Sequence, residues 1–320
     1  MIRIPMIFPG QASQSVGMAA DLMTGSGPAT DFLSTVDQAL DHKLTSCMTN
    51  GPAETLTETW NAQPAILAHS VAVALELREL GITPSVVAGH SLGEYSAAVS
   101  AGALDPLDAL RLVRTRGELM FAAGQEIPGT MAAILGLDAE TVTRVCAEVA
   151  AQHGVVVVAN HNSNAQIAIS GEVAAVEAAC VALKEAGARR AVPLNVSGAF
   201  HSPLLKGAAQ EFSLRLDEVT INEAACPLIA NVTASPATSA TALKQGFDAQ
   251  LTSPVRWFDI MTSLCAGIAD LGSPKFVLEV GPGRVLSNMA KREFPEVTFI
   301  PVGNRSDLET VLDKLGQAGQ

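Results

Sequence analysis

Ser91 stands in the stretch AGHSLGEYSAA, residues 88–98, with one glycine two positions before it and another two positions after it. The apolar run SVVAG at 85–89 predicts a buried strand, and the residues that follow the serine predict a helix. A serine at such a turn lies beside the free amides of a helix N-terminus and is typical of a nucleophile. The main-chain amide of Leu92 is then placed to donate to an oxyanion. The alternative is a tight turn in which the Ser91 hydroxyl only caps the helix.

A serine nucleophile needs a general base, and the chain offers six histidines. His201, in SGAFHSPLL, is our candidate because it lies where the middle region of the chain returns to the main domain, just before a predicted helix. His90 precedes Ser91 on the predicted strand, so its side chain is expected to point to the opposite face. No acidic residue stands out as a third member. We therefore expect a Ser–His dyad, oriented by a backbone carbonyl or a side-chain amide.

The helix predicted over 107–120, LDALRLVRTRGELM, carries a charge on its apolar face. At about 100° per residue, Arg116 falls in the middle of the apolar arc, whereas Arg114 and Glu118 lie off it as an i,i+4 pair. A guanidinium cannot lose its charge, and burying it without a partner is costly. Two explanations stay open: an internal carboxylate partner, or a substrate carboxylate that Arg116 binds with two hydrogen bonds.

The apolar runs predict the elements that must position these side chains. Short strands alternate with helices, which indicates a mostly parallel sheet covered on both faces. The strands are expected at 3–8, 85–89, 228–232, 276–280 and 297–302, and the helices at 63–80, 92–101, 106–123, 203–218 and 255–271. From residue 130 the order becomes β-α-β-β-α-β, which is the ferredoxin-like signature. We therefore expect an α/β domain of residues 1–126 and 198–320, interrupted by a ferredoxin-like subdomain at 127–197, with a cleft at their junction.

Composition limits the partners and the compartment. The chain has 320 residues and a formal net charge of −12, so it has no general attraction for nucleic acid or anionic lipid. No apolar run approaches the ~18 residues of a membrane span, and MIRIPMIFPG is too short for a signal peptide. The five cysteines are scattered without a C-x-x-C pair, which favours reduced thiols. We expect a cytoplasmic monomer with no nucleic-acid or membrane partner.

A series of ordered motifs resembles the malonyl-CoA:acyl-carrier-protein transacylase family, which includes the acyltransferase domains of polyketide and fatty-acid synthases. The resemblance runs over nearly the whole chain and implies an α/β-hydrolase-like domain with a ferredoxin-like insert. Its motifs are FPGQASQSVGM at 8–18, QPAILAHS at 63–70, AGHSLGEYSA at 88–97, the Arg-Gly of RTRGELM, GTMAAILGL at 129–137, ANHNSNAQIAISG at 159–171, VSGAFHSPLL at 196–205, QLTSPVRW at 250–257 and EVGPG at 279–283.

The resemblance implies a role for each residue that matches a family motif. Ser91 corresponds to the acyl-carrying nucleophile and His201 to its base. Gln250, in QLTSPV, corresponds to the residue whose main-chain carbonyl orients that histidine. Gln11, in PGQ, corresponds to the second oxyanion donor beside Leu92.

The substrate side of the site is implied in the same way. Arg116 corresponds to the family arginine that binds the malonyl carboxylate. Other positions correspond to the lining of the family's substrate pocket: Met131, Asn160, Phe200 and Val280. The GAFH motif is of the malonyl-selective type, because relatives that accept methylmalonyl usually have a smaller residue than Phe200. Ala12 is a departure, since the family usually has glycine there; the loop is undisturbed unless it needs a positive φ.

The resemblance therefore implies transfer of malonyl from malonyl-CoA to the phosphopantetheine thiol of acyl carrier protein, through a malonyl-serine intermediate. This reaction is expected to supply fatty-acid synthesis. Neither a metal nor a redox cofactor is needed. A freestanding acyltransferase of a polyketide synthase is an alternative with the same chemistry. An acyl-thioester hydrolase is an alternative of another class, although such an enzyme has little use for a carboxylate-binding Arg116. Because carrier proteins of this pathway are usually acidic, the predicted docking patch consists of Lys206, Arg284, Lys291 and Arg292.

Overall fold

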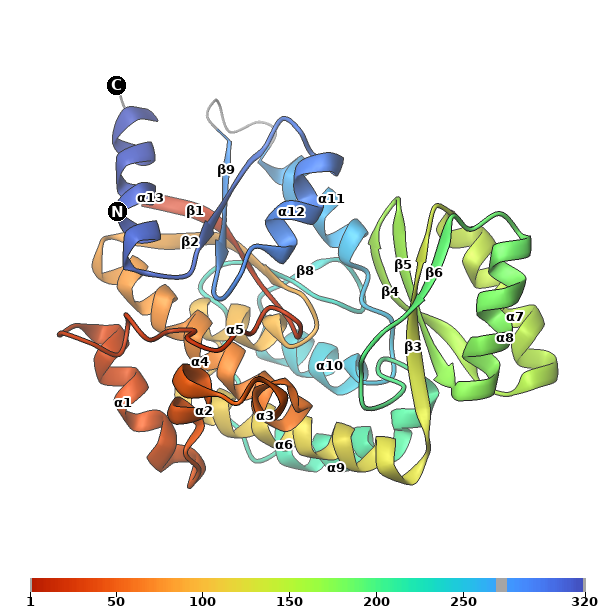
Figure 1. The fold of residues 1–320 in the computed structure, drawn as a ribbon. Helices are drawn as coiled ribbons and strands as arrows, with labels where there is room; N and C mark the ends of the chain where they lie inside the picture. The colour runs from red at the N-terminus through yellow and green to blue at the C-terminus, as the bar shows by residue number, and fades with distance from the viewer. Residues whose placement is uncertain (1, 269–274, 319–320) are drawn as a thin grey trace.

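Two separate β-sheets organise the chain (Figure 1). The structure is a computed structural model, and it describes residues 2–268 and 275–318. The larger sheet has six strands in the order β10-β9-β1-β2-β7-β8. These strands are β1 (Ile2–Phe8), β2 (Ile82–Gly89), β7 (Leu228–Ile229), β8 (Pro236–Ala237), β9 (Phe276–Val280) and β10 (Thr298–Val302).

The six-stranded sheet is parallel except for the final β7–β8 pair. The carboxyl-terminal halves of β1 and β2 are mostly buried and apolar, as expected of strands covered on both faces. Successive side chains of β1 alternate between two apolar layers: Phe8 packs in the layer that includes Val87 and Leu278, whereas Ile7 packs in the layer that includes Ala88. The predicted parallel sheet is confirmed.

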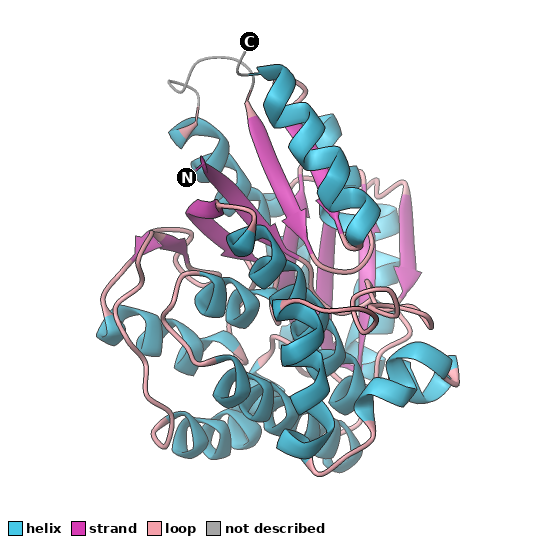
Figure 2. Ribbon diagram, turned by 90° about the vertical axis from the view of Figure 1, so that its left-hand side faces the viewer, coloured by secondary structure: helices cyan, strands magenta, loops and turns pink. Residues whose placement is uncertain are grey.

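Helices cover both faces of this sheet (Figure 2). They are α1 (Pro28–Leu40), α2 (Leu44–Asn50), α3 (Ala53–Thr57), α4 (Thr59–Glu79), α5 (Gly93–Ser100), α6 (Pro106–Glu126), α9 (Lys206–Leu216), α10 (Ala240–Gln250), α11 (Trp257–Gly267), α12 (Val285–Glu293) and α13 (Arg305–Ala318). The helix expected at 203–218 is divided into a 3₁₀ turn, Pro203–Leu205, and α9. The predicted extension of α11 through 269–271 lies outside the described residues.

The smaller sheet is antiparallel and has the strand order β4-β5-β3-β6. Its elements follow the predicted β-α-β-β-α-β order: β3 (Gly129–Leu135), α7 (Ala139–His153), β4 (Val156–Ser163), β5 (Gln166–Glu172), α8 (Val173–Glu185) and β6 (Arg190–Pro193). Both helices pack on its outer face, away from the larger sheet (Figure 1). Ile134, Ile167 and Leu183 contribute to the core between them.

The edge strand β4 is attached to the larger part of the chain through the backbone of Val255. The Val255 amide donates to the carbonyl of Ala159 at 2.8 Å, and its carbonyl accepts from the amide of His161 at 2.9 Å. Asn160 and Val255 thus form an isolated parallel bridge. This connection holds Asn160 at the junction of the two sheets.

Two expectations from composition are tested by the fold. All five cysteines are free thiols, and all but Cys180 are buried. Among the described residues, no helix combines the length and apolar character needed to cross a bilayer.

Candidate active site

Ser91 occupies a strained turn between β2 and α5. Its φ is 50°, a left-handed conformation that non-glycine residues seldom adopt. The turn also requires very close packing, because a Cβ atom on Gly89 would overlap the backbone of Gly93, and one on Gly93 would overlap the carbonyl of Phe8. The two glycines therefore let the helix approach the strands, and Ser91 lies at the strand-to-helix turn that the sequence predicts.

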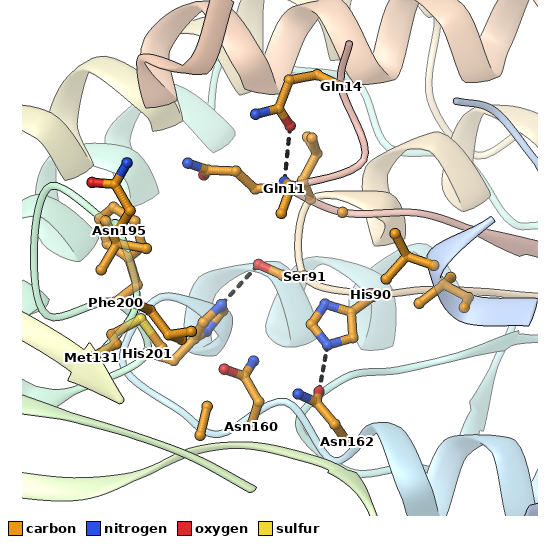
Figure 3. A pocket seen from close by; sticks show the side chains of 18 of the residues that line it. Gln11, Gln14, His90, Ser91, Met131, Asn160, Asn162, Asn195, Phe200 and His201 are labelled. Atoms are coloured by element: carbon orange, nitrogen blue, oxygen red, sulfur yellow. Dashed lines mark hydrogen bonds between the residues drawn. The ribbon is translucent and has the colours of Figure 1, made fainter. Parts of the chain in front are cut away.

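The Ser91 hydroxyl is hydrogen-bonded to a histidine from a distant part of the sequence (Figure 3). Its Oγ lies 2.7 Å from Nε2 of His201. On the other side of the ring, Nδ1 lies 3.0 Å from the main-chain carbonyl of Gln250. Because a carbonyl only accepts, Nδ1 carries the proton and Nε2 is free to accept from the serine. The structure thus places Ser91, His201 and Gln250 in the order expected of nucleophile, base and orienting carbonyl.

His201 is buried and held in its neutral form. Burial is the larger cause of a pKa lowered to about 3, and the positive charge of Arg116 lowers the pKa further. The hydrogen bond to the Gln250 carbonyl acts in the opposite direction. A neutral imidazole at physiological pH is the form that a general base requires. Like Ser91, His201 has a positive φ, of 55°.

Arg116 is 1% exposed and points at the same hydroxyl. Its Nη2 donates to Ser91 Oγ at 3.1 Å and to Oε1 of Gln250 at 3.0 Å, and its Nη1 donates to Oε1 of Gln63 at 2.7 Å. All three acceptors are neutral, and Arg116 forms no salt bridge within the part of the chain that the structure describes. Its guanidinium also lies over the ring of Tyr95, with Cζ 5.7 Å from the ring centre. The predicted Arg114–Glu118 pair forms on the other side of the helix.

These groups open into a cavity of about 490 Å³ between the two sheets. Met131, Asn160 and Phe200 line it, in the positions that the sequence motifs assign to the substrate pocket. Val280 does not: it is fully buried in the main core at the end of β9. Val280 lies away from the cavity because it is the last residue of β9, a strand whose side chains pack into the apolar layers on either face of the sheet. In that region Leu286, in the first turn of α12, forms part of the cavity wall instead.

The two predicted oxyanion donors also face this cavity, which both Gln11 and Leu92 line. Within residues 2–268 and 275–318, neither main-chain amide has a hydrogen-bond acceptor. An unpaired amide at a buried turn is available to a ligand. Ala12 has a φ of 78°, so the loop does adopt the positive φ that favours glycine at this position.

The sequence reading misses two polar residues that bind the serine turn. Asn231 accepts a hydrogen bond from the Ser91 amide at 2.8 Å and donates to the Gly89 carbonyl at 2.7 Å. Glu94 is 1% exposed, and its carboxylate accepts a hydrogen bond from the main-chain amide of Asn231 at 2.9 Å. One signal was present for Glu94, since it is the only charged residue in the otherwise apolar and small-residue helix α5. Asn231 follows a buried strand, and only the three-dimensional fold brings it to Ser91.

His90 lies on the cavity side of the turn, contrary to the prediction from strand alternation. Figure 3 shows its hydrogen bond to Asn162, in which Nε2 lies 2.8 Å from Oδ1, and its ring packs edge-on against Trp257. The prediction was wrong because β2 ends at Gly89, so alternation no longer applies one residue later in the strained turn.

A parallel α/β sheet with a serine–histidine pair at a strand-to-helix turn defines a serine enzyme of the acyl-transfer type. Residues 6–304 match the acyl transferase domain family. The malonyl CoA-acyl carrier protein transacylase of Bacillus subtilis is 43% identical over 315 residues, covering 98% of each chain. The chain belongs to the malonyl-CoA:acyl-carrier-protein transacylase family.

Solved structures agree with this assignment. The acyl carrier protein S-malonyltransferase of Vibrio cholerae matches with a TM-score of 0.90 at 39% identity, covering 97% of this chain and 99% of that one. A malonyl-transacylase solved in complex with a holo acyl-carrier protein of a type II polyketide synthase matches with a TM-score of 0.89 at 40% identity, covering 98% and 99%. Both have the mixed α/β architecture described above.

Proposed function

We propose that this protein transfers the malonyl group of malonyl-CoA to the phosphopantetheine thiol of an acyl carrier protein, through an ester on Ser91, and thereby supplies fatty-acid synthesis. The observation that carries the proposal is the position of Arg116. A buried guanidinium with only neutral acceptors donates to the nucleophile itself, at 3.1 Å. An acyl group with a free carboxylate gives that charge a directly bonded negative partner, whereas acetyl and longer alkyl chains give it none.

In the first half-reaction, Ser91 Oγ attacks the thioester carbonyl of malonyl-CoA while its proton moves to Nε2 of His201, 2.7 Å away. The amides of Leu92 and Gln11 stabilise the oxyanion, and one such donor is worth roughly 3–4 kcal/mol. The intermediate collapses by breaking the carbon–sulfur bond. The CoA thiolate leaves with the proton from His201, and malonyl stays on the serine.

In the second half-reaction, the pantetheine thiol of the carrier protein gives its proton to His201 and attacks the ester. Collapse of the second intermediate returns the proton to Ser91 Oγ and releases malonyl-carrier protein. Both halves use the same oxyanion donors, so the acceptor decides the outcome. Water in place of the thiol would turn the protein into a hydrolase.

The lining of the cavity supports a small dicarboxylic acyl group. Phe200 and Met131 are nearly fully buried at its wall, and Asn160 supplies an amide. We assign Phe200 to the exclusion of a methyl branch on the acyl group, because it directly precedes the base and leaves little room beside it.

The strand order supports a finer description of the architecture. The order β4-β5-β3-β6 with both helices on one face is that of a ferredoxin-like unit, so we assign 127–197 to a ferredoxin-like subdomain. Residues 1–126 and 198–320 then form an α/β-hydrolase-like domain with the serine turn after β2. The five free thiols support a reducing, cytoplasmic location.

Mass spectrometry of the intact protein tests this function directly. Mixing with malonyl-CoA is expected to add one malonyl group to the wild-type protein and none to Ser91→Ala. Addition of holo carrier protein then moves the group to the carrier. Release as free malonate before the carrier is added contradicts the proposal and supports the hydrolase. Running the second step with fatty-acid and with polyketide carrier proteins separates the two pathways. The polyketide carrier is included because one structural relative was solved in complex with such a carrier.

A further inference from the structure

Glu94 is a buried carboxylate that the proposed reaction does not use. It lies on α5, one turn after the nucleophile, and both of its oxygens are hydrogen-bonded. Oε1 accepts from the main-chain amide of Asn231 at 2.9 Å, and Oε2 accepts from Nε2 of the Gln250 side chain. Taking a carboxylate out of water is costly, so its position calls for an explanation beyond packing.

Glu94 and the Ser91 carbonyl together decide how the Gln250 side-chain amide is oriented. A side-chain amide has one donating and one accepting end, and an ionised carboxylate only accepts. Nε2 of Gln250 must therefore face Glu94, where it also donates to the Ser91 carbonyl at 3.0 Å. As a consequence Oε1 faces the other way, and it accepts from Nη2 of Arg116 at 3.0 Å. The orientation of this one amide thus gives Arg116 an acceptor in place of a donor.

Asn231 is the second arm of the same network. Its side chain bonds the backbone on both sides of the strained serine, at the Ser91 amide and the Gly89 carbonyl. Asn231 therefore supports the turn, and Glu94 joins that support to Gln250 and Arg116. The network contains one buried negative and one buried positive charge, separated by the Gln250 amide. Burial raises the pKa of Glu94 to about 7, and its hydrogen bonds and the Arg116 charge oppose that rise.

We propose that Glu94 is a positioning residue for carboxylate specificity: it orients the Gln250 side-chain amide so that Arg116 is held toward an acyl carboxylate beside Ser91. The assignment rests on the proposed malonyl transfer, because it explains how that site distinguishes malonyl from acetyl. Glu94 contacts no reacting atom itself.

Glu94→Gln tests the proposal because it keeps the side-chain volume. The oxygen of the new side-chain amide still accepts from the main-chain amide of Asn231. The NH₂ group of the new side chain is therefore turned toward Nε2 of Gln250. Two donors then face each other, so the Gln250 amide moves away from residue 94, while the Ser91 carbonyl still requires Nε2 on its own side. Oε1 moves with the amide, so Arg116 loses the alignment of this acceptor and is displaced from its position beside Ser91.

The experiment compares malonyl-CoA with acetyl-CoA in two ways. Single-turnover acylation of Ser91 gives the ratio of the two rates. Equilibrium binding of both thioesters to proteins that carry Ser91→Ala gives the ratio of affinities without any transfer step. In Glu94→Gln we expect both malonyl-over-acetyl ratios to fall by roughly 10- to 100-fold, the scale of a lost hydrogen bond to a charged group.

Two further variants show whether such a change is specific. Glu279→Gln is the matched control: Glu279 is fully buried and also accepts two amides, those of Leu286 and Ser287, but it touches neither Gln250 nor Arg116. It is expected to lower stability while both ratios stay within about twofold of wild type. Asn231→Asp places an acceptor against the Gly89 carbonyl. It is expected to slow acylation by both thioesters to the same extent.

The outcomes separate this inference from the proposed function. If wild type prefers malonyl-CoA and Glu94→Gln keeps that preference within about twofold, Glu94 is only structural and the inference is wrong, while the proposed function stands. If wild type shows no preference in either measurement, Arg116 does not bind the acyl carboxylate and both fail. A fall in the ratios in Glu279→Gln as large as in Glu94→Gln also overturns the inference, because any buried carboxylate then has the same effect.

Discussion

Nη2 of Arg116 donates to Oγ of Ser91 at 3.1 Å, so the group that we propose binds the acyl carboxylate is in direct contact with the proposed nucleophile. The same hydroxyl is 2.7 Å from Nε2 of His201, and it can donate to the imidazole while it accepts from the arginine. A malonyl carboxylate that replaces Ser91 as acceptor for Arg116 leaves the serine bonded to its base alone. The proposed role of Arg116 therefore implies that substrate binding frees the nucleophile.

Arg116→Ala is expected to lower malonyl transfer roughly 100- to 1,000-fold, because two hydrogen bonds from a buried charge to the substrate are lost. Acetyl transfer should fall far less, since acetyl has no carboxylate. The measurement is kcat/KM for both thioesters. Arg114→Ala is the matched control: Arg114 is on the same helix but pairs with Glu118 outside the cavity, so its loss should leave the ratio unchanged. Equal losses for malonyl and acetyl in Arg116→Ala would make Arg116 a structural residue.

The low pKa of His201 predicts a contribution to stability that depends on pH. The unfolded chain binds a proton at this histidine near pH 6.5, whereas the folded protein does so only near pH 3. As pH falls from 7 to 4 the unfolded state therefore gains a proton that the folded state does not. This destabilises the fold, by at most about 1.4 kcal/mol per pH unit.

His201→Asn isolates this contribution. Asparagine keeps a donor for the Gln250 carbonyl, tolerates the positive φ and does not titrate. The free energy of unfolding of wild type should decrease relative to that of the variant as pH falls from 7 to 4, in urea titrations. Glu94, whose raised pKa acts in the opposite direction between about 4.5 and 7, is present in both proteins and cancels in the difference. Parallel pH profiles for the two proteins would show that His201 titrates normally in the folded state.

Ala12→Gly is expected to leave stability unchanged or raise it by up to about 1.6 kcal/mol. Glycine removes the cost of a side chain at φ 78°, about 1–2 kcal/mol, but adds roughly 0.4–1 kcal/mol of freedom to the unfolded chain. Ala20→Gly, in the same segment without a positive φ, is the control and should only destabilise. Urea unfolding measures both. Equal destabilisation by the two glycines would mean that Ala12 carries no strain.

The parallel sheet and the order of the elements in the smaller sheet were predictable because both depend on local patterns. Runs such as SVVAG are apolar along their whole length, as buried parallel strands require. Among the helices of the described residues, those not predicted are α1, α2, α3, α10, α12 and α13. Two of them, α1 and α10, were missed although Leu33 and Val36 show helical spacing and Ser239 caps α10. Their sequences are rich in Ser, Thr, Ala and Asp, which lowers the apolar contrast on which periodicity depends.

The site was predictable where one residue type is unusual for its surroundings. Arg116 on an apolar face and Ser91 between two glycines are such cases. Asn231 and Glu94 could not be assigned a role, because their partners are more than 130 positions apart in the sequence and an isolated Asn or Glu indicates no chemistry. His90 was misplaced for another reason: β2 ends at Gly89, as predicted, but strand alternation was applied to the residue after it, which lies in the turn.

Phe200→Ser should admit a branched acyl group. Phe200 is 5% exposed at the cavity wall and directly precedes His201, so a smaller side chain there leaves space for one more methyl group. The ratio of kcat/KM for methylmalonyl-CoA to that for malonyl-CoA is expected to rise by about 10- to 200-fold. Met131→Leu is the control, because it replaces another residue of the cavity wall by one of nearly the same volume. It should leave the ratio nearly constant. An unchanged ratio in Phe200→Ser would assign the exclusion of the methyl branch to another residue.

The basic residues of α12 give a prediction about the acceptor. Arg284 directly precedes α12, Lys291 and Arg292 lie in its last turn, and all three are exposed. The first turn of this helix, with Val285 and Leu286, lines the cavity. An acidic carrier protein that docks there places its pantetheine at the cavity entrance, and salt screens the attraction between exposed charges.

Reversing the charges at Arg284 and Lys291 to glutamate should therefore slow transfer from malonyl-Ser91 to the carrier protein at low salt. Formation of malonyl-Ser91 from malonyl-CoA should change less, because CoA does not need the carrier's docking surface. Stopped-flow or quenched-flow mass spectrometry of the two half-reactions separates these effects. Arg144→Glu, on the outward-facing helix α7, is the control, because it also replaces a positive side chain by a negative one. If transfer to the carrier at low salt is as fast in the double variant as in Arg144→Glu, the carrier docks elsewhere.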